Sequence, residues 1–158
     1  MKNLINIFCL LILFSVTSNC GYKVLDNADY KDFSFNTINT TGDKRINFRI
    51  KNDLIVDSSE NKKNRLIMNL ETKKIKTIKE KNIKNEITKY EISLIANVNL
   101  NFLDDDLVKQ FMVKTTGDFT VDSKYSTTLK NEKRLIEDLT DNLSNKIKNK
   151  INLILNDL

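Results

Sequence analysis

The chain has 158 residues, a formal net charge of +5 at pH 7, two cysteines, no proline and no histidine. This length suits one domain with a sizeable hydrophobic core. The lack of histidine removes the commonest general base and metal ligand, so any site that depends on an imidazole is excluded.

The N-terminal segment pairs one positive charge, Lys2, with a nearly unbroken apolar run from Leu4 to Phe14. A helix that spans a bilayer needs about 20 apolar residues, whereas the core of a signal peptide needs only about 7–15. We therefore predict that residues 1–19 are a secretory signal and that the mature chain has no transmembrane helix.

Cys20 follows this run in the sequence Thr17-Ser-Asn-Cys20, which resembles the lipobox of bacterial lipoproteins. In a lipobox the cysteine is diacylated and the signal is cut just before it. Thr17 and Asn19 are not the usual lipobox residues, so an ordinary secretory signal that leaves a stray thiol is the alternative. Because Cys9 would leave with the signal, Cys20 would be the only thiol of an exported chain, which favours lipidation.

Residues 20–32 are polar and weakly patterned, and we predict that they tether the lipid to the domain formed by residues 33–158. Gly21 is not the aspartate that usually retains lipoproteins in the inner membrane, so sorting to the outer membrane is expected. Removal of Lys2 with the signal lowers the net charge from +5 to +4. For an exported, mildly basic chain we expect no nucleic-acid partner.

The first elements of the domain are a short strand and a helix. Phe33, Phe35 and Thr37 alternate with polar residues, which predicts a strand that ends near the turn residues 41–43. Asp43 is a suitable cap for a helix that runs to about residue 56. One face of that helix repeats apolar residues every fourth position: Ile46, Ile50 and Leu54.

After a predicted loop at residues 57–64, three strands follow. The second strand begins with Leu66, Met68 and Leu70 on one face, opposite Asn69 and Glu71. The third strand has the clearest period of two, with these residues on one face: Tyr90, Ile92, Leu94, Ala96, Val98, Leu100 and Phe102. Residues 104–106 are predicted to form a turn, and the fourth strand carries Leu107, Phe111, Val113, Phe119 and Val121, with Gly117 as a possible bulge.

From about residue 127 the period becomes helical. Apolar residues recur every three or four positions as Ile136, Leu139, Leu143, Ile147, Ile151, Ile154 and Leu158. We therefore predict an α+β two-layer sandwich in which two helices cover one face of a four-stranded sheet, in the order β-α-β-β-β-α. The opposite face would be polar, either facing water or enclosed in a polar cavity, with these residues: Glu91, Ser93, Asn97, Asn99, Asn101, Gln110, Lys114 and Thr116.

The sequence offers little for catalysis, and we expect no enzyme, no metal site and no cofactor. Asp104, Asp105 and Asp106 are the only dense group of carboxylates, but they lack the alternating ligands and glycine of a calcium loop. A hairpin turn is their simpler interpretation. A carboxylate-dependent hydrolase built around Asp105 is the weakest of the functional alternatives.

A lysine-rich segment, KKIKTIKEKNIK at residues 73–84, is predicted to join the second and third strands. Its ammonium groups alternate with isoleucines, which suits a ligand with phosphates beside acyl chains. The alternative is a solvated hairpin that its charges protect from edge pairing. The candidate ligand-binding residues are Lys73, Lys74, Lys76, Lys79, Lys81 and Lys84.

The chain resembles the lipopolysaccharide-assembly lipoprotein family LptE. The resemblance is carried by Cys20-Gly-Tyr22 directly after the signal, by the strand, helix, three strands and closing helix, and by the segment from Gly117 to Ser126. It covers nearly the whole mature chain and rests more on this layout than on fixed residues.

The resemblance implies a lipid-anchored protein on the periplasmic side of the outer membrane that sits inside the β-barrel protein LptD. There it would act as plug and assembly factor and help to deliver lipopolysaccharide, which family members bind through basic residues. The alternative is a structural or interaction lipoprotein of another cell-envelope complex.

Overall fold

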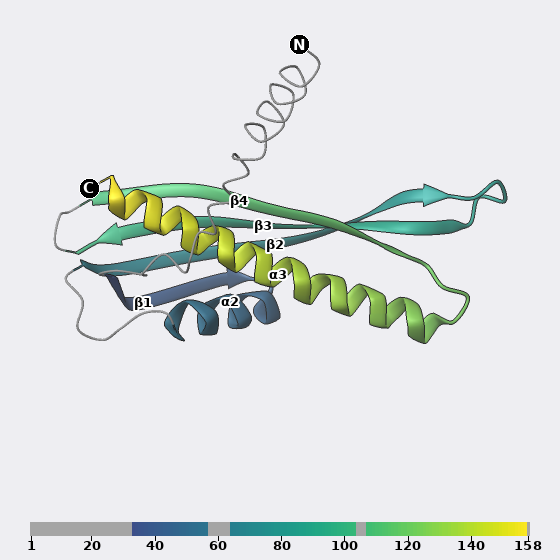
Figure 1. Cartoon of the computed structure of the whole chain (residues 1–158), viewed down its shortest axis with the longest axis horizontal. Coiled ribbons are helices and arrows are strands. Elements are labelled where there is room, and N and C mark those ends of the chain that lie inside the picture. Colours follow the sequence, from purple (N-terminus) through teal and green to yellow (C-terminus); the bar gives the residue numbers. More distant parts are fainter. Residues whose placement is uncertain (1–32, 57–63, 104–106, 158) are drawn as a thin grey trace, which may run out of the picture.

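The computed structural model describes residues 33–56, 64–103 and 107–157, which form one sheet with two helices (Figure 1). Residues 1–32, 57–63, 104–106 and 158 lie outside this description, and with them Cys20 and the predicted aspartate turn. The elements are β1 (Phe33–Gly42), α2 (Lys44–Val56), β2 (Asn64–Lys81), β3 (Ile87–Phe102), β4 (Leu107–Thr120) and α3 (Tyr125–Asn156).

The strands lie side by side in the order β1-β2-β3-β4. β1 is parallel to β2, and the remaining neighbours are antiparallel. Both helices cover the same face of the sheet, and α3 runs obliquely along it (Figure 1). The predicted fold class and element order are confirmed. Within the described residues, no helix is both long and apolar enough to cross a membrane.

The core lies between the sheet and the helices. Every second residue of β3 from Ile92 to Phe102 is buried there, as the period of two predicts. The helices bury their predicted stripes against it, namely Ile46, Ile50 and Leu54 of α2 and Leu139, Leu143, Ile147 and Ile151 of α3. At about 25 cal/mol per Å² of apolar surface, this burial is the main source of stability.

A bulge in β1 changes the predicted phase of that strand. Phe35 pairs with Leu66 and Thr37 with Ile67, so Asn36 is an extra residue on the β1 side. The prediction that Thr37 shares the face of Phe33 and Phe35 is therefore wrong. Ile38 takes the next buried position instead, and the residues of β1 that face away from the helices are shifted by one.

The link between β1 and α2 depends on Gly42 and Asp43. Gly42 has φ +98°, and a Cβ at this position would lie 1.9 Å from the carbonyl oxygen of Thr72 on β2. Asp43 caps α2, since its Oδ1 accepts hydrogen bonds from the backbone N–H groups of Arg45 and Ile46 at 3.1 and 3.2 Å. Burial alone raises the pKa of Asp43, but these N–H groups and the charge of Lys74 outweigh it and lower the pKa.

Gly117 serves close packing and does not form the predicted bulge. The β3–β4 register runs without interruption past the pair Ile92 and Gly117. A Cβ at Gly117 would lie 2.8 Å from Cδ1 of Leu135 on α3. The glycine therefore lets α3 approach the sheet, and the bulge prediction is wrong.

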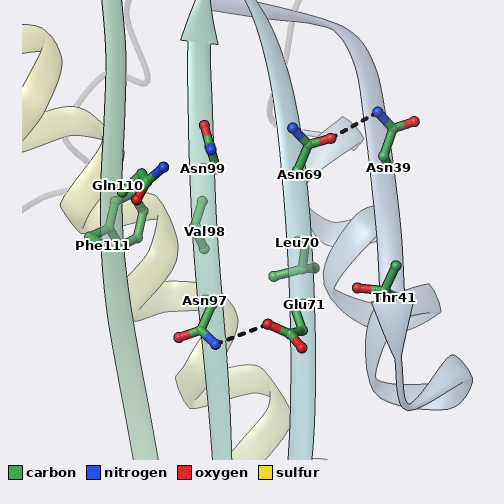
Figure 2. Close-up of a pocket in the computed structure, with 10 residues that line it drawn as sticks. All are labelled: Asn39, Thr41, Asn69, Leu70, Glu71, Asn97, Val98, Asn99, Gln110 and Phe111. Carbon is green, nitrogen blue, oxygen red and sulfur yellow. Dashed lines mark hydrogen bonds between the residues drawn. The ribbon is translucent and has the colours of Figure 1, made fainter.

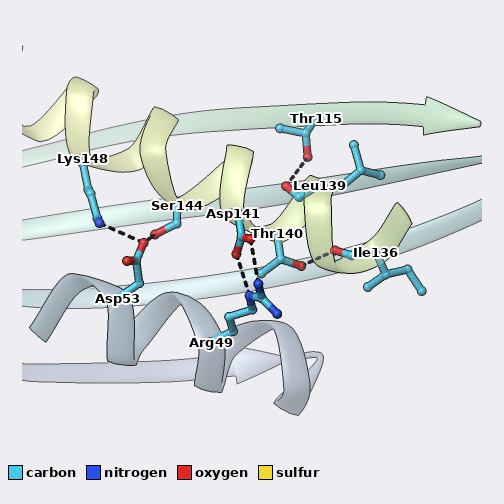
Figure 3. A network of polar contacts seen from close by, with 9 residues as sticks. All are labelled: Arg49, Asp53, Thr115, Ile136, Leu139, Thr140, Asp141, Ser144 and Lys148. Atoms are coloured by element: carbon cyan, nitrogen blue, oxygen red, sulfur yellow. Dashed lines mark hydrogen bonds and ion pairs between the residues drawn. The ribbon is translucent and has the colours of Figure 1, made fainter. Parts of the chain in front are cut away.

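Polar contacts fix α2 against α3 (Figure 3). Arg49 donates from Nε and Nη2 to the two carboxylate oxygens of Asp141 at 2.5 and 2.7 Å. Asp53 accepts a hydrogen bond from Ser144 and lies 2.9 Å from the ammonium of the buried Lys148. Partial burial raises the pKa of Asp53, but Ser144 and Lys148 outweigh it and hold the pKa below its ordinary value.

Candidate functional site

The face of the sheet that the helices leave uncovered carries a continuous row of side-chain amides. The strand register places Asn39 beside Asn69, Asn69 beside Asn99, and Asn99 beside Gln110. Figure 2 shows these four residues side by side, one from each strand. We call Asn39, Asn69, Asn99 and Gln110 the amide row. The amide row exists only in the folded sheet, because its four members are far apart in sequence and come together through strand pairing.

A shallow trough of about 500 Å³ follows the amide row. The row's neighbours at the trough are Glu71, Asn97 and Thr41, and its lining is completed by Leu70, Val98 and Phe111. Asn39 donates to Oδ1 of Asn69 at 2.9 Å, and Asn97 donates to Oε2 of Glu71 at 3.1 Å (Figure 2). Hydrogen bonds thus hold part of the trough's polar lining in place.

Two acceptors on this face lack a donor. Oδ1 of Asn99 and Oδ1 of Asn101 are buried, and neither accepts a hydrogen bond within the described part of the chain. Leaving a buried acceptor unsatisfied costs about 1–3 kcal/mol. Native proteins contain few such groups, so each one calls for a ligand, a partner or a bound water.

The trough has no excess of positive charge. Of the residues that the structure describes, Glu71 is the only ionisable one in the lining, and neither lysine nor arginine is among them. The nearest lysines on the same face, Lys73 and Lys114, flank Ile95 in the next row of the sheet. The site is therefore suited to hydrogen bonding with neutral groups, and its carboxylate disfavours anions.

The polar face was predicted in part. Asn97, Asn99, Asn101 and Gln110 were placed there from the alternation of their own strands, as were the hydrogen-bonded Ser93 and Thr116, whose hydroxyls are 3.0 Å apart. The row itself was missed, because it depends on strand order and register. Asn39 was also missed, since the bulge at Asn36 reverses the expected phase of β1.

The lysine-rich segment is mostly a strand. β2 continues to Lys81, and the connection to β3 is the short turn at residues 82–86, where Asn85 has φ 64°. The prediction that residues 73–84 form the connection is therefore wrong. The two strands run on as a ribbon that projects beyond the helices (Figure 1).

Half of the predicted lysines are paired with carboxylates. Lys74 lies 3.4 Å from Asp43, Lys76 lies 2.7 Å from Glu132, and Lys79 lies 3.1 Å from Asp118. The hydrogen bond and charge of Lys79 lower the pKa of Asp118.

The six lysines do not converge on one point. Lys74 and Lys76 reach the helix side of the sheet, where Lys76 also lies 4.3 Å from the ring centroid of Tyr90. Lys81 donates to Oδ1 of Asn85, Lys84 lies in the turn, and Lys73 is exposed on the uncovered face. We call these six residues the lysine ribbon, and they do not form a single phosphate pocket.

The same lysines follow an open edge of the sheet. The pairing of β1 with β2 ends at Gly42 and Thr72, so within the described ranges no strand pairs with β2 on that side from Lys73 onward. Charged side chains on such an edge oppose pairing with another chain. This arrangement matches the alternative interpretation of the segment.

Metal binding has no support in the described residues, where no group of three or more His, Cys, Asp or Glu side chains is placed to hold an ion. Cys20, the predicted lipidation site, lies outside them.

No family model matches the chain, and no curated protein is significantly similar to it in sequence. Solved structures do match its fold. The rare lipoprotein B of Shewanella oneidensis is similar with a TM-score of 0.59 and 11% identity, over 77% of this chain and 98% of that one.

Two further lipoproteins share the arrangement. Lipoprotein B of Nitrosomonas europaea, described as uncharacterized, gives a TM-score of 0.56 and 11% identity, over 77% of this chain and 83% of that one. A minor lipoprotein of Acinetobacter baumannii gives a TM-score of 0.52 and 13% identity, over 77% of this chain and 92% of that one. At these identities the likeness shows a common fold.

Proposed function

We propose that the protein is a lipid-anchored, non-catalytic lipoprotein of the bacterial outer membrane that partners with an LptD-type β-barrel in lipopolysaccharide assembly. The observation that carries the proposal is the fold, which matches three solved lipoproteins over 77% of this chain. The signal-like N-terminus and Cys20 support the anchor, and the LptE-like layout supports the choice of partner.

The uncovered face supports residence in a polar enclosure. A sheet face rich in amides suits the lumen of a membrane β-barrel, which is polar and contains water. The apolar face of the same sheet is already buried under both helices and is not available to a partner.

The test is affinity purification of the tagged full-length chain from solubilised envelopes, followed by identification of the proteins that remain bound. We expect a large β-barrel protein in stoichiometric yield. Recovery of the chain without a barrel partner overturns the proposed partnership. Mass spectrometry of the same preparation tests the anchor, since the proposal requires residue 20 to be the acylated N-terminus.

Contact of the lysine ribbon with lipopolysaccharide is a separate part of this proposal. Lys73, Lys81 and Lys84 make no ion pair among the described residues, so their charges remain available to phosphates. Replacing these three by glutamine is expected to weaken binding of purified lipopolysaccharide more than replacing Lys74, Lys76 and Lys79. Equal binding by both triple variants and the native chain removes the ribbon from the function.

The pairing of Lys74, Lys76 and Lys79 with carboxylates favours the second candidate, an interaction lipoprotein of another envelope complex. The two candidates differ in the co-purified partner. A periplasmic protein in place of a barrel, together with no binding of lipopolysaccharide, decides for the second.

A further inference from the structure

We propose that the trough along the amide row binds a neutral, hydroxyl-rich saccharide chain laid across the strands. In the cell, the saccharide is the oligosaccharide portion of lipopolysaccharide, an assignment that rests on the proposed function. The saccharide site is separate from the lysine ribbon, and it gives the uncovered face a ligand of its own.

The spacing of the amide row fits a chain of sugars. Neighbouring strands in a sheet are about 4.8 Å apart, which is close to the width of one pyranose ring. Asn39, Asn69, Asn99 and Gln110 therefore present one amide per ring to a saccharide that crosses the strands. A side-chain amide has two N–H donors and a carbonyl acceptor, the groups that hydroxyls require, and the Asn39–Asn69 bond uses one donor and one acceptor site of the row.

The unsatisfied acceptors give a second, independent reason. Oδ1 of Asn99 and of Asn101 are buried without a donor in the described residues, and they lie two positions apart on the same face of β3. Of the two residues only Asn99 lines the trough, and a sugar hydroxyl there can donate to its Oδ1 once the amide turns toward the ligand. The binding of such a ligand would remove a cost that the protein otherwise carries.

Charge decides against phosphate as the ligand of the trough. Glu71 lies at the edge of the amide row, where Asn97 donates to it, and no basic side chain of the described segments lines the trough. A carboxylate repels phosphate but accepts hydrogen bonds from sugar hydroxyls. The phosphates of a glycolipid must therefore lie elsewhere. Lys81 at the end of β2 and Lys84 in the turn lie farther from the trough than Lys73 and are suited to hold them.

The test uses the full-length protein in a detergent without a sugar headgroup, such as a dimethylamine oxide. The probe is core oligosaccharide released from lipopolysaccharide by mild acid and then dephosphorylated with aqueous hydrofluoric acid. It is titrated while backbone amide resonances or binding heats are recorded. The test variant combines Asn69→Val and Asn99→Val, which keep strand propensity and remove two amides. Thr116→Val, on the same face but away from the trough, is the matched control.

We expect the native chain and the control to bind the oligosaccharide, and the double variant to bind it roughly tenfold more weakly or worse. No binding by the native chain overturns the proposal, as does an equal loss in the control. Preferential binding of peptidoglycan fragments overturns the assigned source. Self-association that is abolished by the double variant identifies a second copy as the occupant and also overturns it.

These results are distinguishable from a failure of the proposed function. Oligosaccharide binding by a chain that recovers no barrel partner leaves the trough as a saccharide site and ends the barrel proposal. If the chain recovers a barrel partner but binds no oligosaccharide, the barrel proposal stands and the saccharide site is ruled out.

Discussion

The two faces of the sheet use the same strands for opposite purposes. Along β3, Leu94, Ala96, Val98 and Leu100 are closed off from solvent under the helices, while Asn97 on the other face is exposed and Asn99 and Asn101 carry acceptors without donors. The covered face is packed against the helices of the same chain, whereas the uncovered face has acceptors that no described donor reaches. The difference shows that the packed core lies on the covered face, and we propose that recognition uses the uncovered one.

The sharpest way to break this comparison is to truncate the core. Leu100 is fully buried, and Leu100→Ala is expected to lower the free energy of unfolding by about 2–5 kcal/mol through lost burial and a cavity. Urea denaturation followed by circular dichroism measures the loss. A cost below about 1 kcal/mol would mean that β3 is not packed as described.

Gly42→Ala tests the connection between β1 and α2. The added Cβ would meet the carbonyl oxygen of Thr72, a backbone atom, and the residue would have to keep a positive φ. We expect a loss of about 2 kcal/mol or more in the free energy of unfolding.

Gly117→Ala is the matched control for this glycine. Its Cβ would meet the side chains of Leu135 and Leu139, at 2.8 and 3.4 Å, and no backbone atom, so its cost should be clearly smaller. The same urea transition serves for both variants, and equal costs would contradict the described β1–α2 turn.

Asp53→Asn tests the polar contact between the two helices and its pH dependence. The folded-state pKa of Asp53 lies below the ordinary value of 3.8, so the unfolded chain binds the proton more readily. The stability contributed by this carboxylate is therefore present above the unfolded pKa and lost as pH falls through the folded pKa. At neutral pH the variant should lose about 1–2 kcal/mol, since the carboxylate is partly exposed.

Urea midpoints between about pH 6 and pH 2 check this prediction. The native chain should lose stability toward low pH, and the variant should show a flatter dependence that retains the contribution of Asp43, whose pKa is also lowered. Parallel curves for the two proteins would show that Asp53 does not titrate as described.

The smallest expected effect is that of Asn99→Val, which sharpens the contrast with its neighbour Leu100. This change removes an unsatisfied buried acceptor and introduces a residue that strands favour. The free energy of unfolding should stay constant or rise by up to about 1 kcal/mol. A marked loss of stability would show that Asn99 is structural and would weaken the assignment of this face to recognition.

Much of the fold could be predicted from periodicity. The period of two in β3, the four-residue repeat in α2 and the long stripe of α3 each have a strong local signal, because each face is buried by one kind of element. The capping role of Asp43 was also local and is confirmed. Three predictions were wrong: the phase of β1 beyond Asn36, the bulge at Gly117 and the end of β2. All three features depend on a neighbouring strand or helix.

The candidate site was less accessible to sequence analysis for the same reason. The polarity of the uncovered strand positions follows from alternation, but the meeting of Asn39, Asn69, Asn99 and Gln110 in one row requires strand order and register together. The lysines were noticed because they are close in sequence, yet the strand directs them to opposite faces and pairs three of them with carboxylates.

The most direct test of the uncovered face as the recognition surface is photo-crosslinking in intact cells. A benzoylphenylalanine is placed either at Asn97, which lines the trough, or at Leu153, which is exposed on α3. The account predicts that position 97 gives abundant adducts with an envelope component and that position 153 gives far fewer. Adducts in equal yield at both positions, or predominantly at 153, would contradict it.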